Sequence, residues 1–169
     1  LAGATWVDVS IPEASDPESR HPFKGNIDVA KLRELIAREG PERIAFVRQE
    51  ACLNMAGGQP FSLENLRAVR ALTREFDIPF FLDATRSSEN ALFVKEREAG
   101  HDARPMREIL REIASLADGA VFSSKKDHFV PIGGFVATSL AGVAERLREL
   151  VVVYEGFPQY GGLAGHDME

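Results

Sequence analysis

The sequence predicts an α/β fold in which a mostly parallel sheet has helices on both faces. Two observations indicate this class. Short apolar runs of strand length alternate along the chain with longer segments whose apolar residues recur at helical spacing. Three of the apolar runs are followed directly by polar residues. In open α/β sheets, ligand sites lie at the carboxyl ends of the strands, so polar residues are expected there. Strands separated by helices imply parallel pairing through right-handed crossovers.

The composition is that of a globular chain with one core. Of the 169 residues, 44% are hydrophobic and 27% are charged, as in ordinary globular proteins. A chain of this length is too short to form two domains that each have a sizeable core. A net charge of -6 argues against nucleic acid or a membrane surface as the main partner, and no membrane span is present. Cys52 is the single cysteine, so it cannot form an internal disulfide, and we expect it to be a small buried hydrophobe. With no signal peptide in view, a reducing cytoplasm is the expected location.

The first expected element is a strand at residues 5–9, followed by a polar surface loop at 12–26. The chain starts at Leu1 without a methionine, close to this strand, and it stops in GGLAGHDME, where a helix would begin. We therefore expect the chain to be an excerpt of a longer protein.

The next segments predict a helix and a strand. Asp28 is expected to cap a helix that stops at Gly40 and Pro41. The apolar positions of this helix are Leu32, Leu35 and Ile36. Residues 43–47, RIAFV, then predict a strand.

The middle of the chain repeats this alternation. After a turn-rich segment, Ser62 is expected to cap a second helix. Its apolar stripe is Leu63, Leu66, Val69 and Leu72. Residues 78–83, IPFFLD, predict the next strand, and helical patterns follow at 88–98 and 106–117.

The last elements predicted are two strands and a helix. A strand at 120–122 precedes a pair of lysines, and GGFVATS at 133–139 predicts a further strand. Ser139 is expected to cap the final helix. Its inward residues would be Val143, Leu147 and Leu150.

Polar side chains follow three of the predicted strands and are expected at one edge of the sheet: Asn54, Asp83, Arg86, Ser123, Lys125 and Lys126. Lysine suits such a place when its amine must lose a proton and form a Schiff base, although a solvated turn would also place lysines there. Asp83 follows an apolar strand and therefore needs a cationic partner. Arg86 could supply that charge. The protonated ring nitrogen of pyridoxal phosphate is the other candidate, because a carboxylate holds it in its electron-withdrawing form.

Four long segments give the chain a family resemblance: NMAGGQPFSLENLRAVR, DATRSSENALFVKEREAG, SSKKDHFVPIGGF and VVVYEGFPQYGGLAGHDME. In this order they resemble the tryptophanase and tyrosine phenol-lyase family of pyridoxal phosphate enzymes. The resemblance implies the three-layer large domain of fold type I enzymes. Residues 1–169 would be the central part of that domain, with its N-terminal part and the C-terminal small domain outside the chain.

The resemblance also implies roles for the polar residues. Lys126 would carry the cofactor as an internal aldimine, with Lys125 beside it as a fixed positive charge that lowers its neighbour's pKa and holds water. Asp83 would pair with the pyridinium nitrogen, and Arg86 and Asn54 would reach the phenolic oxygen of the cofactor.

Two further ligands are implied by the resemblance alone. Ser123 would contact the cofactor phosphate. The backbone carbonyl of Pro131 would bind a monovalent cation, usually potassium.

The implied activity is β-elimination of an aromatic amino acid, which gives indole or phenol with pyruvate and ammonia. The implied assembly is a homotetramer, a dimer of dimers. Some motifs resemble tyrosine phenol-lyase and others resemble tryptophanase, so the choice between tyrosine and tryptophan stays open. Arg48, Gln49 and Glu50 depart from the family, which is usually more apolar in this region.

Two other interpretations of the sequence stay open. Another fold type I enzyme, such as an aldolase or aminotransferase, would share the aspartate and the lysine. A catalytically incomplete fragment would have the same motifs without the activity.

Overall fold

The structure is a computed structural model that describes residues 3–157 and 159 of the chain. None of the helices in this part of the chain combines the length and the apolar character that a membrane span requires.

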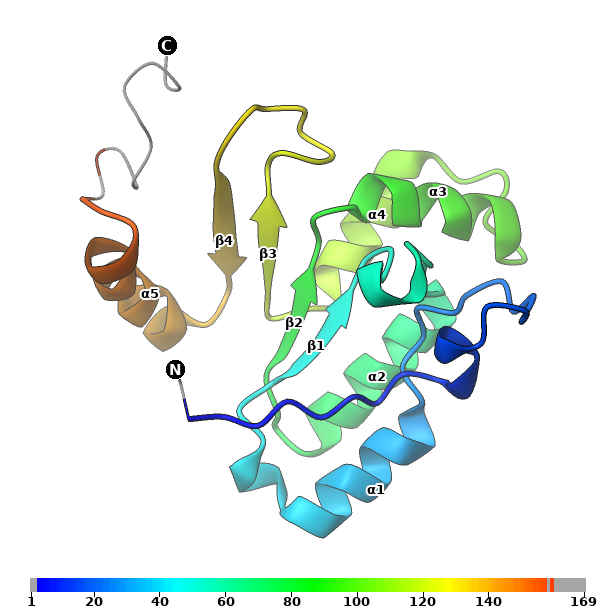
Figure 1. The fold of residues 1–169 in the computed structure, drawn as a ribbon, viewed down its shortest axis with the longest axis horizontal. Helices are drawn as coiled ribbons and strands as arrows, with labels where there is room; N and C mark the ends of the chain where they lie inside the picture. Colours follow the sequence, from blue (N-terminus) through cyan, green and yellow to red (C-terminus); the bar gives the residue numbers. More distant parts are fainter. Residues whose placement is uncertain (1–2, 158, 160–169) are drawn as a thin grey trace.

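The centre of the fold is a four-stranded sheet with the strand order β1-β2-β3-β4 (Figure 1). The strands are β1 (Val47–Glu50), β2 (Phe80–Asp83), β3 (Gly119–Ser123) and β4 (Gly134–Thr138). The first three strands are parallel, and β4 runs antiparallel to β3. The predicted α/β class and mostly parallel sheet are confirmed.

Helices connect the strands in the predicted alternation. They are α1 (Val29–Glu39), α2 (Leu63–Glu75), α3 (Ser87–Arg97), α4 (Met106–Ser115) and α5 (Ala141–Tyr154). Short 3-10 helices lie in the connections: η1 (Pro12–Ser15), η2 (Pro41–Arg43) and η3 (Asn54–Ala56).

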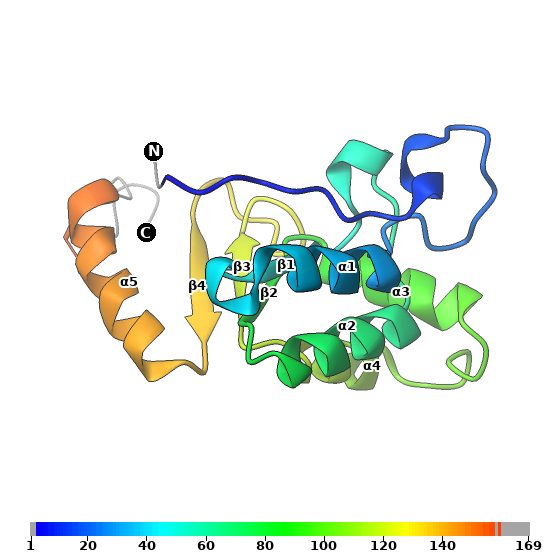
Figure 2. The same cartoon turned by 90° about the horizontal axis from the view of Figure 1, so that it is seen from below.

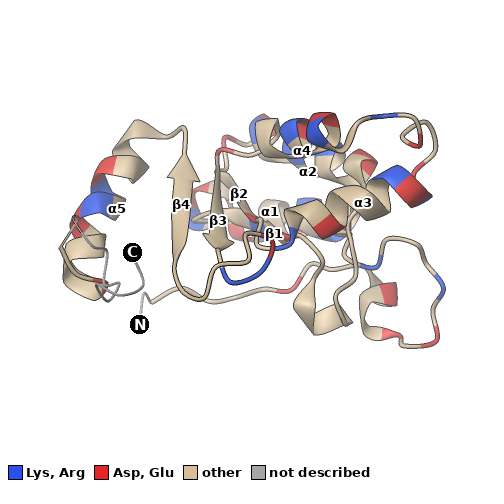
Figure 3. Ribbon diagram, turned by 90° about the horizontal axis from the view of Figure 1, so that it is seen from above, with Lys and Arg blue, Asp and Glu red and all other residues tan. Residues whose placement is uncertain are grey.

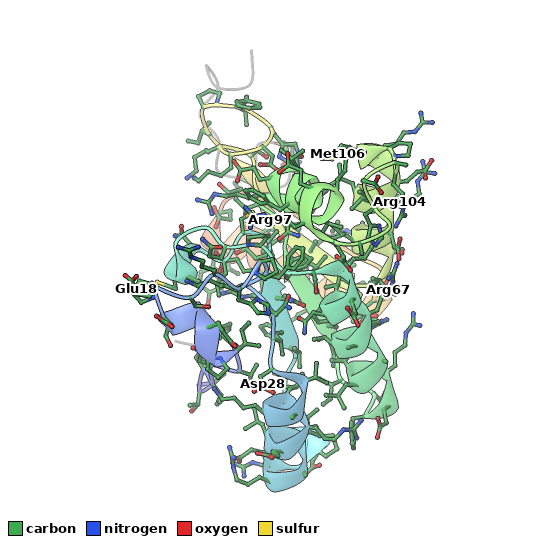
Figure 4. The ribbon with its side chains drawn as sticks, turned by 90° about the vertical axis from the view of Figure 1, so that its right-hand side faces the viewer. Glu18, Asp28, Arg67, Arg97, Arg104 and Met106 are labelled. Carbon is green, nitrogen blue, oxygen red and sulfur yellow. The ribbon has the colours of Figure 1, made fainter. Side chains whose placement is uncertain are left out.

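Two of the predicted helix caps are confirmed. Asp28, at the amino end of α1 (Figure 4), accepts a hydrogen bond from the backbone N–H of Lys31 at 3.0 Å. The Ser62 hydroxyl accepts one from the backbone N–H of Asn65 at 3.1 Å. Each cap satisfies a backbone donor that has no partner inside the first turn of its helix.

The sheet has one buried face at β1 and β2. Figure 2 shows α2 and α4 on one side of the sheet, while the extended segment 3–9 crosses the other side. The buried strand side chains are Val47, Gln49, Phe80 and Leu82. The alternate side chains, which point to the opposite face, are half-buried: Arg48, Glu50, Phe81 and Asp83. This alternation places Asp83 outside the apolar core.

The predicted strand at 5–9 is wrong. These residues are extended, but the segment pairs only through an isolated bridge between Ser10 and Ile27. The backbone N–H of Asp28 also donates to the carbonyl of Val9 at 2.8 Å. Apolar composition predicted a strand, but most of these side chains are exposed and their backbone joins no ladder.

The predicted strand at 43–47 lies too early in the chain. Gly40 has a φ of 86° and leads into η2, so the ladder begins only at Val47. The strand therefore includes Arg48 and Glu50, which face away from the core. The position of β1 is thus set by its pairing with β2, and the local run of apolar residues does not predict it.

The predicted cap of the last helix is also wrong. Leu140 is the N-cap of α5 and makes no side-chain capping bond, whereas the Ser139 hydroxyl donates to the carbonyl of Asp118 at 3.2 Å. None of the residues of α5 is fully buried. The residues expected to face inward are half-buried: Val143, Leu147 and Leu150.

An ion pair links α2 to Asp118, the residue directly before β3. The Asp118 carboxylate accepts hydrogen bonds from both terminal nitrogens of Arg70, at 2.7 and 2.5 Å, and from the backbone N–H of Phe80 at 2.9 Å. Its backbone carbonyl accepts from the Thr138 hydroxyl at 2.8 Å. The Arg70 bonds hold the pKa of Asp118 below its usual range; burial opposes this shift and the Phe80 N–H supports it.

We expect Asp118→Asn to lower the free energy of unfolding by about 2 kcal/mol at neutral pH, because it removes a charge-assisted bond. A depressed folded-state pKa gives stability that is present above the unfolded value near about pH 4 and is lost as the pH falls through the folded value. Urea midpoints of the two forms should therefore converge below about pH 4. A difference that is independent of pH would contradict this account of the ion pair.

Candidate active site

The carboxyl ends of β1, β2 and β3 lie at one edge of the sheet (Figure 1). The register places Asp83 opposite Glu50 on one side and Val121 on the other. The remaining predicted site residues come from the segments that leave this edge: Asn54 in η3, Arg86 at the N-cap of α3, Ser123 at the end of β3, and Lys125 and Lys126 in the turn after it. The fold thus brings these segments to one edge, as the sequence predicts.

The cationic neighbour of Asp83 in the structure is Arg48, whereas the sequence suggested Arg86. Oδ2 of Asp83 lies 3.7 Å from Nη1 of Arg48, on the adjacent strand. Its Oδ1 accepts a bond of 3.4 Å from the backbone N–H of Thr85. Within residues 3–157 and 159, Arg86, the cation considered from the sequence, makes no ion pair with Asp83.

The lysine loop, residues 124–133, is tied to the connection after β2. The Thr85 hydroxyl accepts from the backbone N–H of Ser123 at 3.1 Å. The Asp127 carboxylate accepts from the backbone N–H of Ser88, in the first turn of α3, at 2.7 Å. These two bonds fix the segment that carries the lysines against the segment that carries Arg86.

Both lysines lie in the turn that follows β3. Figure 3 shows this basic stretch, in blue, where the chain leaves the end of β3. Lys125 and Lys126 are exposed, and neither amine makes a hydrogen bond or an ion pair within the described part of the chain. The lysines thus follow β3, the strand that pairs with β2, and no hydrogen bond or ion pair joins either amine to the Asp83 carboxylate within the described residues.

His128, in the lysine loop, packs against aromatic rings. Its ring centroid lies 5.6 Å from that of Phe135 and 5.9 Å from that of Phe122. The two phenylalanines stack on each other at 4.4 Å. This cluster supports the lysine loop from the side of β4.

Asn54 lies in a tight turn after β1. Its backbone N–H donates to Oε1 of Glu50 at 2.9 Å, and its side chain is exposed. Gly57 and Gly58 have φ values of 79° and 76°, which favour glycine. As expected from the sequence, this glycine pair shapes a turn.

The sequence reasoning missed Asn90, which holds that turn in place. Asn90 is fully buried in α3. Its Oδ1 accepts from the backbone N–H groups of Cys52 at 3.2 Å and Phe61 at 3.1 Å, and its Nδ2 donates to the Phe61 carbonyl at 3.0 Å. A polar residue beside the apolar Ala91 and Val94 of the same helix was the signal that could have identified it.

Cys52 is buried, as predicted, with 1% of its surface exposed. Burial raises the pKa of its thiol to about 12, with the nearby Glu89 acting in the same direction. We expect Cys52 to resist iodoacetamide at about pH 8, where roughly one thiol in 10,000 would be ionised, and to react once the chain is unfolded in urea. Mass spectrometry of the alkylated peptide measures both rates. Rapid labelling of the folded protein would contradict this prediction.

A groove of about 910 Å³ lies between the N-terminal segment, α1 and β1. Its lining includes Trp6, Arg48 and Glu50. Asp83 and Lys126 are not among its lining residues, although Arg48 and Glu50, which flank Asp83, are. Pro131 lies exposed in the lysine loop.

Comparisons with known proteins identify the family to which the chain belongs. The model of the beta-eliminating lyase family matches residues 1–165. The chain belongs to the beta-eliminating lyase family. It is 52% identical to tyrosine phenol-lyase from Symbiobacterium sp. (strain SC-1), over all of this chain and 37% of that protein.

Other members of the beta-eliminating lyase family give similar values. The chain is 50% identical to tyrosine phenol-lyase from Nostoc punctiforme over its whole length, and 46% identical to tryptophanase from Salinibacter ruber over 99% of its length. These matches cover 36% and 35% of the two relatives. The chain thus spans little more than a third of the length of the relatives it matches, and the family match includes every predicted site residue.

Proposed function

We propose that the chain is the central part of the cofactor-binding domain of a pyridoxal phosphate lyase that acts on an aromatic amino acid. The observation that carries the proposal is the placement of Asp83 at the end of the middle parallel strand, with the Asn54 turn on one side and the lysine loop on the other. Family membership supports the elimination reaction. Relatives named tyrosine phenol-lyase and tryptophanase support an aromatic substrate.

The side chains at this edge fit the cofactor by their chemistry. A half-buried carboxylate, Asp83, suits a protonated ring nitrogen. Arg86 has a guanidinium without an ion pair in the described residues, which suits the phenolic oxygen together with Asn54. Ser123 lies at the end of β3, where its hydroxyl would hold the phosphate.

Pyridoxal phosphate, when bound, supplies the electron sink for the carbanion. Asp83 would hold the proton on the ring nitrogen, and Arg86 would orient the ring through its phenolic oxygen. Lys126 would hold the cofactor covalently through its amine, and once the substrate amine has taken its place the freed Lys126 amine would be the candidate to take the α-proton. Lys125 provides a fixed positive charge beside it. The products are phenol or indole, pyruvate and ammonia, with water consumed.

The rest of the site lies outside this chain in our proposal. The whole protein would be a homotetramer, built as a dimer of dimers, and the carbonyl of Pro131 would bind potassium. Closed symmetric assembly is common among enzymes and lets a neighbouring subunit complete an open pocket edge.

The test of the proposed function is the position of the covalent link in the full-length protein. Reduction with borohydride in the presence of pyridoxal phosphate, followed by peptide mapping, is expected to label Lys126. The matched controls are Lys125→Ala, which should keep the label, and Lys126→Ala, which should lose it. A label on Lys125 would show that the assignment of the two lysines is wrong, and no label on either would refute the cofactor. Release of phenol from tyrosine or of indole from tryptophan identifies the substrate.

A further inference from the structure

Two charged residues on β1 face the candidate cofactor carboxylate. Arg48 and Glu50 are two positions apart, so they share a face of the strand, and that face is the one on which Asp83 lies in β2. Arg48 Nη2 lies 3.4 Å from Oε2 of Glu50, and its Nη1 lies 3.7 Å from Oδ2 of Asp83. The side chain of Arg48 is 33% exposed, that of Glu50 is 15% exposed and that of Asp83 is 22% exposed. Water therefore screens these three charges only in part.

Each member of this pair is also held by a second contact. The Arg48 guanidinium lies over the ring of Trp6, 4.7 Å from its centroid. The other carboxylate oxygen of Glu50 accepts the backbone N–H of Asn54 at 2.9 Å. Glu50 therefore connects the charges around Asp83 to the turn that carries Asn54.

The balance of charge gives this arrangement a function. Arg48 alone beside Asp83 would cancel the negative charge that a protonated ring nitrogen needs. Glu50 offsets Arg48, because two carboxylates and one guanidinium leave a single negative charge on the three groups together. Arg48 can thus orient the Asp83 carboxylate while the site keeps its attraction for a cation.

The geometry points to Arg48 and Glu50 as positioning residues for the cofactor site. Arg48 aligns the Asp83 carboxylate, and Glu50 both preserves its negative field and fixes the Asn54 turn. The inference rests on the proposed function, since it assumes that Asp83 meets the ring nitrogen of pyridoxal phosphate.

The experiment compares two ligands on the full-length protein by absorbance titration. One is pyridoxal phosphate and the other is 1-deazapyridoxal 5′-phosphate, in which carbon replaces the ring nitrogen. Glu50→Gln is expected to weaken pyridoxal phosphate by about tenfold relative to the deaza analogue, because Arg48 is then uncompensated. Arg48→Met is expected to shift the same ratio in the opposite direction.

The double variant separates charge balance from structural support. Glu50→Gln combined with Arg48→Met restores a single negative charge, so its ligand ratio should return to within about threefold of the unmodified protein. Damage to the fold would instead make the double variant at least as poor as Glu50→Gln. That result, or an unchanged ratio in Glu50→Gln, would overturn the inference.

A second measurement needs no cofactor. Glutamine keeps an acceptor oxygen for the Asn54 N–H, whereas Glu50→Leu removes it. Hydrogen exchange at residues 52–59 in the apo protein should therefore be unchanged in Glu50→Gln and faster in Glu50→Leu. Equal exchange in Glu50→Leu would refute the role of Glu50 in fixing the turn.

The two proposals fail in different ways. Asp83→Asn should lower the preference for pyridoxal phosphate over the deaza analogue if Asp83 meets the ring nitrogen. An unchanged preference in Asp83→Asn would refute the proposed function. A lowered preference in Asp83→Asn together with an unaffected Glu50→Gln would refute only the role of the Arg48 and Glu50 pair.

Discussion

Replacing Asp83 with asparagine is expected to lower the turnover of the full-length protein by about 100-fold or more, while cofactor binding is partly retained. The amide keeps the size of the side chain but has no negative charge to hold a proton on the ring nitrogen. Without that proton the ring withdraws electrons poorly, and removal of the α-proton becomes slow. Phenol or indole release at saturating pyridoxal phosphate measures the effect.

A chemically matched control is Asp77→Asn. Asp77 is exposed at the opposite end of β2, and its φ of 53° is a conformation that asparagine also accepts. The control is expected to retain activity. If Asp83→Asn is as active as Asp77→Asn, the Asp83 carboxylate has only a structural role.

Replacing Asn90 with leucine is expected to lower the free energy of unfolding by about 3 kcal/mol or more. Leucine has the same branching at Cγ but cannot form hydrogen bonds, so it leaves the N–H groups of Cys52 and Phe61 and the Phe61 carbonyl buried without partners. Leucine is also larger than asparagine and would overpack this buried site. The turn that carries Asn54 would then lose its attachment to α3. We therefore expect weaker binding of pyridoxal phosphate together with the lower stability.

Urea unfolding followed by circular dichroism measures the change in stability. The matched control is Asn54→Leu, which makes the same substitution at an exposed position in the turn that Asn90 holds. The control is expected to change stability by less than about 0.5 kcal/mol. Equal midpoints for the two variants would show that the Asn90 bonds do not stabilise the fold.

Local signals predicted much of the fold because they depend on neighbouring residues alone. Asp28 and Ser62 cap the helices that follow them, and Gly40 marks the end of α1. The strand positions at 5–9 and 43–47 could not be predicted in this way. Ladder partners decide whether an apolar segment is a strand, and those partners lie far away in the sequence.

The same distinction explains the candidate site. Asp83, Arg86 and the two lysines stand in short motifs directly after apolar runs, so the sequence indicated their common edge. The ion pair of Asp83 with Arg48 depends on the pairing of β1 with β2. Asn90 binds backbone groups 29 and 38 positions away, and sequence patterns do not reveal such contacts.

The register of the sheet has a consequence for how this protein can diverge. Side chains alternate between the two faces, so Asp83 shares a face with Glu50 and Leu82 shares the opposite one with Gln49. Deleting one residue within β2 would exchange the faces of Asp83 and Leu82 relative to the strand residues before the deletion, so that the carboxylate would point toward the apolar core. A substitution in β2 therefore changes one side chain, whereas deletion of one residue would change the face of every strand residue on one side of the deletion.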